Sequence, residues 1–107
     1  MTISELQARS YKMATEKGWN ERVIPVPEQV ALLHSECSEM LEAYRNNEPN
    51  SWTDEKGKPQ GIGSELADIL VRAGHYAQLN KVDLEGEVLK KIAYNGTRAH
   101  RHGGKVV

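Results

Sequence analysis

Apolar residues recur every three or four positions in four successive segments of the chain, whereas the alternation typical of strands is hard to find. Because that spacing places apolar side chains along one side of a helix, it predicts an all-α fold. Thr2 and Asp83 are suited to cap helix N-termini, and Pro27 suits a first helical turn, where its missing N–H needs no partner. We therefore expect a four-helix bundle-like core. The expected helices cover about residues 3–18, 27–45, 61–79 and 84–95.

The composition is that of an ordinary globular chain. Of 107 residues, 38% are hydrophobic and 27% charged, with a net charge of -1, so we expect one domain over residues 1–107 that is neither disordered nor strongly attracted to nucleic acid. The first residues, MTISELQARSYK, fit neither a signal peptide nor a membrane span, which favours a cytoplasmic protein without a membrane partner. The one cysteine, Cys37, excludes an intrachain disulfide framework and is expected to lie in the core.

Two segments lie outside the helical pattern. Residues 46–61, NNEPNSWTDEKGKPQG, are rich in Asn, Pro, Gly and charge, which predicts a long loop. A loop of this length in a compact domain is often functional. Residues 97–107, TRAHRHGGKVV, form a basic tail.

The second and third expected helices carry the same local arrangement of acids. Each has two carboxylates three residues apart, beside an apolar stripe that we expect to face the core. The acids are Glu36 and Glu39 on one helix and Glu65 and Asp68 on the other. The stripes consist of Leu33, Cys37, Met40, Leu41 and Tyr44 and of Ile62, Leu66, Ile69, Leu70 and Ala73. A single acid pair of this kind is usually a solvated flank of a helix.

Two matching acid pairs are stronger evidence for a binding site than a single pair is. If the helices pack along these flanks, four carboxylates converge, and like charges in a partly dry space are unfavourable unless a cation neutralises them. Oxygen ligands select hard cations, so the sequence predicts a Mg²⁺ site in which Mn²⁺ could substitute. A di-iron site is set aside because its Glu-x-x-His signature occurs nowhere, and we expect His34 and His75 to be surface or core histidines.

The fourth expected helix and the two tryptophans suggest contacts to a polyanionic ligand. Lys91, Asn95 and Arg98 follow the spacing of one helix face, which offers two cations and an amide, although capping of the helix end explains them equally well. Trp19 and Trp52 could stack on a nucleobase or fill a core or an interface.

Three motifs, taken together, resemble a known family. They are ECSE at 36–39, ELAD at 65–68 and KIAYNGTRAHRHGGK from Lys91 onward. Their order and spacing over about residues 28–105 are similar to those of the MazG-like nucleotide pyrophosphohydrolases of the all-α NTP pyrophosphatase superfamily. One position departs from the family pattern, because Ser35 stands where a first glutamate is common. That departure leaves the general base open.

The resemblance implies a fold, an activity and roles for residues. It implies a four-helix core that assembles as a homodimer or homotetramer, with active sites between helices of neighbouring subunits. It implies that the four acids bind Mg²⁺ and catalyse hydrolysis of a nucleoside triphosphate to monophosphate and pyrophosphate, with a pyrimidine such as dCTP as a first candidate. Lys91 and Arg98 would contact phosphates and Asn95 the sugar.

Two other functions remain open at this stage. The chain could be a helical dimerisation module that carries its basic tail to an acidic partner, but three cations are few for nucleic-acid binding that survives physiological salt, so no stable nucleic-acid partner is expected. It could also be a related hydrolase that cleaves a nucleotide-containing metabolite. Only cleavage between the α and β phosphates of a triphosphate releases pyrophosphate.

Overall fold

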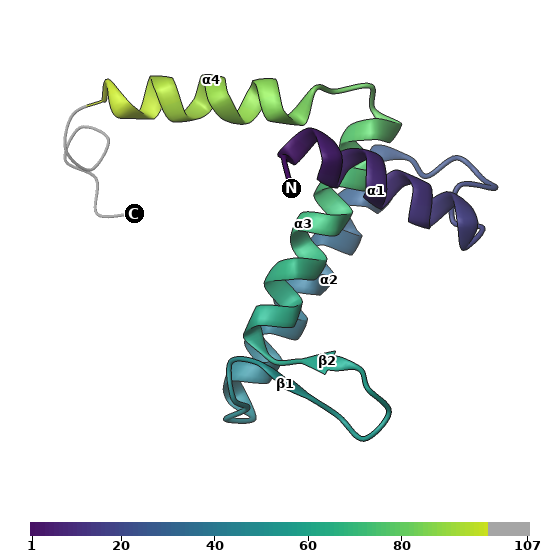
Figure 1. Cartoon of the computed structure of the whole chain (residues 1–107), viewed down its shortest axis with the longest axis vertical. Helices are drawn as coiled ribbons and strands as arrows, with labels where there is room; N and C mark the ends of the chain where they lie inside the picture. The colour runs from purple at the N-terminus through teal and green to yellow at the C-terminus, as the bar shows by residue number, and fades with distance from the viewer. Residues whose placement is uncertain (99–107) are drawn as a thin grey trace.

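The computed structural model describes residues 1–98 and has four helices and one short hairpin in that range (Figure 1). The elements are α1 (Ile3–Glu16), α2 (Val26–Arg45), β1 (Trp52–Thr53), β2 (Pro59–Gln60), α3 (Ile62–Leu79) and α4 (Leu84–Gly96). The all-α prediction is confirmed, with helix ends close to those expected. Most of the expected basic tail, residues 99–107, lies outside the described residues. Within residues 1–98, no helix combines the length and the hydropathy needed to span a bilayer.

The predicted capping residues begin the helices as expected. The Thr2 hydroxyl accepts from the Glu5 backbone N–H at 3.0 Å, while the Glu5 carboxylate accepts from the Thr2 N–H at 3.2 Å. This reciprocal pair satisfies two N–H groups that the first helical turn leaves without partners. Asp83 caps α4 by accepting from the Gly86 N–H at 3.2 Å, and Pro27 lies in the first turn of α2.

Helices α2 and α3 lie side by side and antiparallel, and α1 packs across the C-terminal half of α3 (Figure 1). The crossing of α1 and α3 is close at Gly74, where an added Cβ would lie 3.1 Å from the Ser10 Oγ. The buried apolar side chains among the described residues are few and mostly small. They are Ala14, Ala43, Tyr76 and Ala77.

Helix α4 joins the other helices only near its start. Gln7 of α1 ties the α3–α4 connection down by donating to the Val82 carbonyl at 2.8 Å and by accepting from the Leu84 N–H at 3.2 Å. The rest of α4 leads away from the α2–α3 pair (Figure 1). The radius of gyration, 16.2 Å, accordingly exceeds the value of about 13 Å expected for a compact chain of this length.

The two apolar stripes are covered only in part by other elements of the chain, contrary to the expectation that they face a core. Leu70 is 58% exposed and Tyr44 70%, and Leu41 and Leu66 are each about half exposed. Cys37 is also exposed, so its expected place in the core is wrong. The reason is that α2 and α3 turn their acid flanks toward each other while α4, which could have covered the stripes, points away.

The expected long loop contains the hairpin formed by β1 and β2. Its turn depends on Asp54, whose carboxylate accepts from the backbone N–H groups of Lys56 and Lys58 and from the Gln60 amide. These bonds satisfy turn donors and lower the pKa of Asp54. The strands were missed because each has only two residues and shows no periodicity. Gly61, which follows β2 directly, joins the hairpin to α3 with φ +97°.

We predict that Gly61→Ala lowers the free energy of unfolding more than Gly57→Ala does. Both glycines have positive φ, and strain at such positions costs about 1–3 kcal/mol. A Cβ at Gly61 would also lie 2.5 Å from the Pro49 carbonyl oxygen, whereas a Cβ at Gly57 has nothing within 4 Å. Urea unfolding followed by circular dichroism measures the difference. Equal losses in the two variants would contradict the close approach at Gly61.

Candidate metal centre

The four predicted acids meet between α2 and α3. Glu36 and Glu39 lie near the middle of α2, and Glu65 and Asp68 lie in the first two turns of α3. One carboxylate oxygen from each residue lies within 4.8 Å of the others. Glu36 is buried, Glu65 is half-buried, and the other two are exposed. The expected convergence of the acid flanks is therefore confirmed, and we call these four residues the acid cluster.

One cation of the chain already contacts the acid cluster. The Arg72 Nε donates to the Glu36 Oε1 at 2.6 Å, and the Arg72 Nη1 donates to the Tyr76 hydroxyl at 3.0 Å. Burial opposes ionisation of Glu36, but the hydrogen bond from Arg72 and further hydrogen bonds outweigh it, so the pKa of Glu36 is lowered. Glu36 is therefore held as a carboxylate.

The pKa values of the two acids on α3, Glu65 and Asp68, are raised instead. Burial, followed by the neighbouring Glu39, Asp68 and Glu36 carboxylates, raises the pKa of Glu65 to about 7. Desolvation and then the Glu36 charge also raise the pKa of Asp68. Without a bound cation, a large fraction of Glu65 is therefore protonated near neutral pH, because burial and the neighbouring carboxylates disfavour its charge.

Two oxygens of the acid cluster suggest what the cluster could bind. With all four acids ionised, the Glu36 Oε2 and the Glu65 Oε2 are buried and have no hydrogen-bond partner within residues 1–98. Buried polar atoms are nearly always paired, so such atoms call for an explanation. A divalent cation held by the four carboxylates would give both oxygens a partner, and an all-oxygen donor set suits Mg²⁺ or Mn²⁺. The residues present therefore fit a hard cation.

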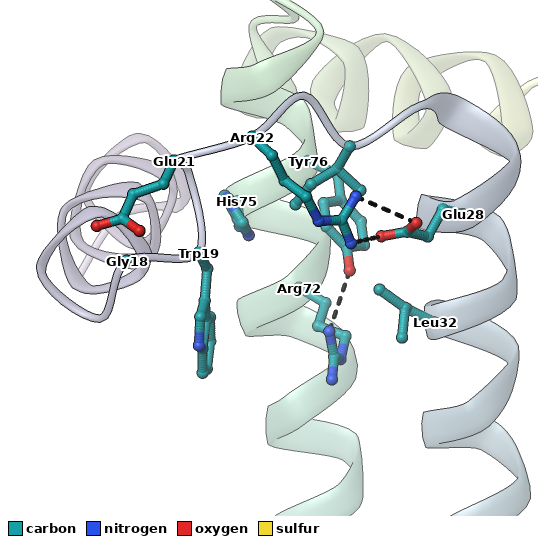
Figure 2. Close-up of a pocket in the computed structure, with 10 residues that line it drawn as sticks. Gly18, Trp19, Glu21, Arg22, Glu28, Leu32, Arg72, His75 and Tyr76 are labelled. Atoms are coloured by element: carbon teal, nitrogen blue, oxygen red, sulfur yellow. Dashed lines mark hydrogen bonds and ion pairs between the residues drawn. The ribbon is translucent and has the colours of Figure 1, made fainter.

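Arg72 also lines a cavity of about 520 Å³ (Figure 2). Its walls come from the α1–α2 connection, from α2 and from α3. The lining includes Trp19, Arg22, Leu32, Arg72 and Tyr76. Trp19 is the one predicted ligand-binding residue that the structure places in this cavity. Because Arg72 contacts both Glu36 and Tyr76, the cavity and the acid cluster are neighbours.

His75 anchors the segment that carries Trp19. It is 5% exposed, and its Nε2 lies 2.6 Å from the Asn20 Oδ1, to which it donates. Burial, and then the positive charge of Arg72, lower the pKa of His75, which favours the neutral ring. His75 is therefore a core histidine and His34 a surface one, as expected. This hydrogen bond holds Asn20, the residue next to Trp19, against α3.

Sequence reasoning missed Arg72 and Tyr76. A signal was present, because Arg72 follows Asp68 by four residues and Tyr76 follows Arg72 by four, so the three share one face of α3. That spacing alone does not show that Arg72 reaches across to α2 rather than pairing with Asp68 on its own helix.

The remaining predicted ligand-binding residues do not line this cavity. Trp52 is in β1, at the end of the α2–α3 pair opposite the α1–α2 connection, and donates from its Nε1 to the Glu48 carboxylate at 2.9 Å (Figure 1). Lys91 and Asn95 lie on α4, which leads away from α2 and α3. Both are exposed, and so is Arg98. Arg98 follows the end of α4, with its Cζ 5.5 Å from the centroid of the Tyr94 ring.

Ser35 offers no substitute for a fifth carboxylate. Its hydroxyl donates to the Leu32 carbonyl of the same helix at 2.8 Å.

Comparisons with protein-family models, curated proteins and solved structures found no match to this chain. The resemblance described above therefore depends on the order and spacing of its motifs.

We predict that the metal-free protein loses stability as pH rises from about 4.5 through 7. The folded-state pKa of Glu65 is raised to about 7, so its contribution is complete below the unfolded-state pKa and is lost as the carboxyl ionises in the folded protein. Melting temperatures across this pH range, in chelator, measure the effect. Glu65→Gln should flatten the decline, and added Mg²⁺ should reverse it in the wild type.

The control for this measurement is Glu42→Gln, which changes an exposed acid of α2 outside the acid cluster. His75 gives a slope of opposite sign, because its lowered pKa makes stability fall as pH drops below about 6.5. Comparison with Glu65→Gln removes this contribution, since both proteins retain His75. Identical pH profiles for wild type and Glu65→Gln would contradict the assigned pKa.

Proposed function

We propose that this protein is a MazG-like, Mg²⁺-dependent pyrophosphohydrolase that cleaves nucleoside or deoxynucleoside triphosphates to monophosphate and pyrophosphate. The observation that supports it best is the acid cluster with two buried, unpaired carboxylate oxygens. A site of this charge favours a cation, and a triphosphate is the kind of anionic substrate that such a cation binds. The order of the motifs supports the choice of reaction.

The proposed roles follow from the positions of the side chains. Glu36, Glu39, Glu65 and Asp68 hold Mg²⁺, for which Mn²⁺ can substitute, and binding displaces the proton that Glu65 holds near neutral pH. The bound ion supplies charge neutralisation for the phosphates and activation of water. Arg72 keeps the Glu36 carboxylate ionised and oriented through its 2.6 Å hydrogen bond. The chain thus provides a preorganised anionic site.

We also propose that the active protein is a homodimer or homotetramer. Single exposed apolar residues are ordinary, but contiguous apolar surface on a soluble domain usually marks an interface. Large exposed apolar residues occur on the stripes of α2 and α3 and on α4. They include Leu41, Tyr44, Leu66, Leu70, Leu89 and Ile92. Packing of α4 against the stripes of a second chain would complete a four-helix core.

Such packing also gives the polar residues of α4 a role. In one chain, α4, which carries Lys91 and Asn95, leads away from the α2–α3 pair that carries the acid cluster (Figure 1). From a second chain, Lys91 and Arg98 could reach the phosphates of the substrate and Asn95 its sugar. Trp19 already lines the cavity beside the acid cluster, and in this proposal it stacks on the base. Trp52 does not line this cavity.

We predict that Glu36→Gln and Asp68→Asn each lower turnover about a thousandfold or more, because loss of a metal ligand removes several kcal/mol of charge stabilisation. The assay incubates purified protein with Mg²⁺ and a panel of ribo- and deoxynucleoside triphosphates, and resolves pyrophosphate, phosphate and monophosphate. Helical content, checked by circular dichroism, should not change. The matched control is Glu42→Gln, which should retain wild-type turnover.

Two outcomes of this assay would contradict the proposal. Near-full activity in either variant would remove that residue from the metal site. If the wild type cleaves no triphosphate and Mg²⁺ does not change its melting temperature, the acids are solvated flanks and the chain is better described as a helical interaction module. Monophosphate without pyrophosphate would indicate a related hydrolase.

We predict that Leu70→Glu shifts the protein toward monomer and lowers turnover with it, since Leu70 lies in the exposed stripe of α3. A buried, unpaired charge at an interface is strongly unfavourable. Light scattering coupled to size-exclusion chromatography measures the mass. Val23→Glu is the control, because Val23 is 86% exposed and lies outside the stripes. A wild-type protein that is monomeric at working concentration would contradict the assembly.

A further inference from the structure

The Arg72 guanidinium makes two hydrogen bonds within residues 1–98 and has further N–H groups without a partner there. Its Nε is bonded to Glu36 of the acid cluster and its Nη1 to the Tyr76 hydroxyl. A guanidinium has five N–H groups in a fixed plane, and these two bonds use two of them. Within residues 1–98, the Nη2 has no hydrogen-bond partner. Arg72 therefore offers an oriented pair of donors to a ligand in the cavity.

The cavity suits an aromatic, uncharged group. Its volume of about 520 Å³ falls in the range typical of sites for small organic ligands. Trp19, Leu32 and Tyr76 provide aromatic and apolar surface (Figure 2). The second arginine of the lining, Arg22, is already paired with Glu28. Arg72 differs from Arg22 in that its Nη2 has no partner within residues 1–98 and its Nε contacts Glu36 of the acid cluster.

We propose that the cavity holds the nucleobase of the substrate and that Arg72 selects it, by donating two hydrogen bonds to adjacent acceptor atoms on one edge of the base. This inference rests on the proposed function, because it takes the phosphates to lie at the acid cluster. A ligand that spans both sites must pass along Arg72, which contacts each of them. Trp19, anchored through Asn20 and His75, stacks on the base.

The donor pair distinguishes the bases by their chemistry. Guanine presents adjacent acceptors at O6 and N7, the pair that arginine most often contacts, and cytosine presents adjacent acceptors at O2 and N3. Adenine, uracil and thymine have donors and acceptors in alternation, so a guanidinium can satisfy only one acceptor at a time. Cytosine and guanine nucleotides should therefore be favoured by about 5- to 100-fold, the usual range for a bidentate contact.

The experiment measures binding of nucleosides, which have no phosphate and need no metal. The chain has two tryptophans, so a Trp52→Phe background leaves Trp19 as the reporter. Quenching of its fluorescence by cytidine, guanosine, adenosine and uridine is titrated in chelator. Cytidine or guanosine should bind more tightly than the other two, and comparing them shows which acceptor pair fits.

Three variants in this background test the role of Arg72. Arg72→Met should abolish the preference, Tyr76→Phe should reduce it by freeing the guanidinium, and Arg22→Met should leave it intact, because Arg22 lines the same cavity but is already paired. Tyr76→Phe keeps the charge beside Glu36, so it remains informative if Arg72→Met folds poorly. Loss of affinity by an equal factor for all four nucleosides would overturn the selection by Arg72.

The outcome is separable from that of the proposed function. A wild-type protein that hydrolyses triphosphates but binds the four nucleosides equally, or fails to bind any of them, overturns the inference alone. A preference that depends on Arg72 supports the inference even if no triphosphate is cleaved, and the proposed reaction would then be the part that fails.

Discussion

Four carboxylates share a partly dry space between two helices, and the rest of the structure follows from how their repulsion is offset. Arg72 neutralises one charge through Glu36, and a proton on Glu65 offsets another near neutral pH. With the acids ionised, the Glu36 Oε2 and the Glu65 Oε2 have no partner among residues 1–98. The arrangement by itself adds no stability to the chain, and a cation held by the four carboxylates would offset the remaining negative charge.

The acid cluster also determines which surfaces of the helices remain free. Because the acid flanks of α2 and α3 face each other, part of each apolar stripe stays exposed. Helix α4 leads away from the α2–α3 pair and does not cover these stripes. The protein therefore has a small buried core and large exposed apolar side chains. The proposed assembly would cover these side chains and bring the cations of α4 to the acid cluster.

Arg72 links the chemistry of the two sites. On one side it orients a carboxylate of the acid cluster, and on the other it borders the cavity that contains Trp19. A change at Arg72 therefore acts on both, which is why nucleosides that lack phosphates are needed to separate selection of the base from binding of the metal. His75 of α3 is hydrogen-bonded to Asn20. This bond holds the segment that carries Trp19 against α3.

The sequence alone determined the features that depend on short-range spacing. Helical periodicity identified all four helices, the capping box at Thr2 and the cap at Asp83 marked two of their starts, and the matched acid pairs identified the acid cluster. Tertiary structure decided which face of each helix is covered, since periodicity identifies a stripe but not its partner. It therefore exposed Cys37, separated Trp19 from Trp52 and directed Arg72 across to Glu36, because these outcomes depend on contacts between residues far apart in the chain.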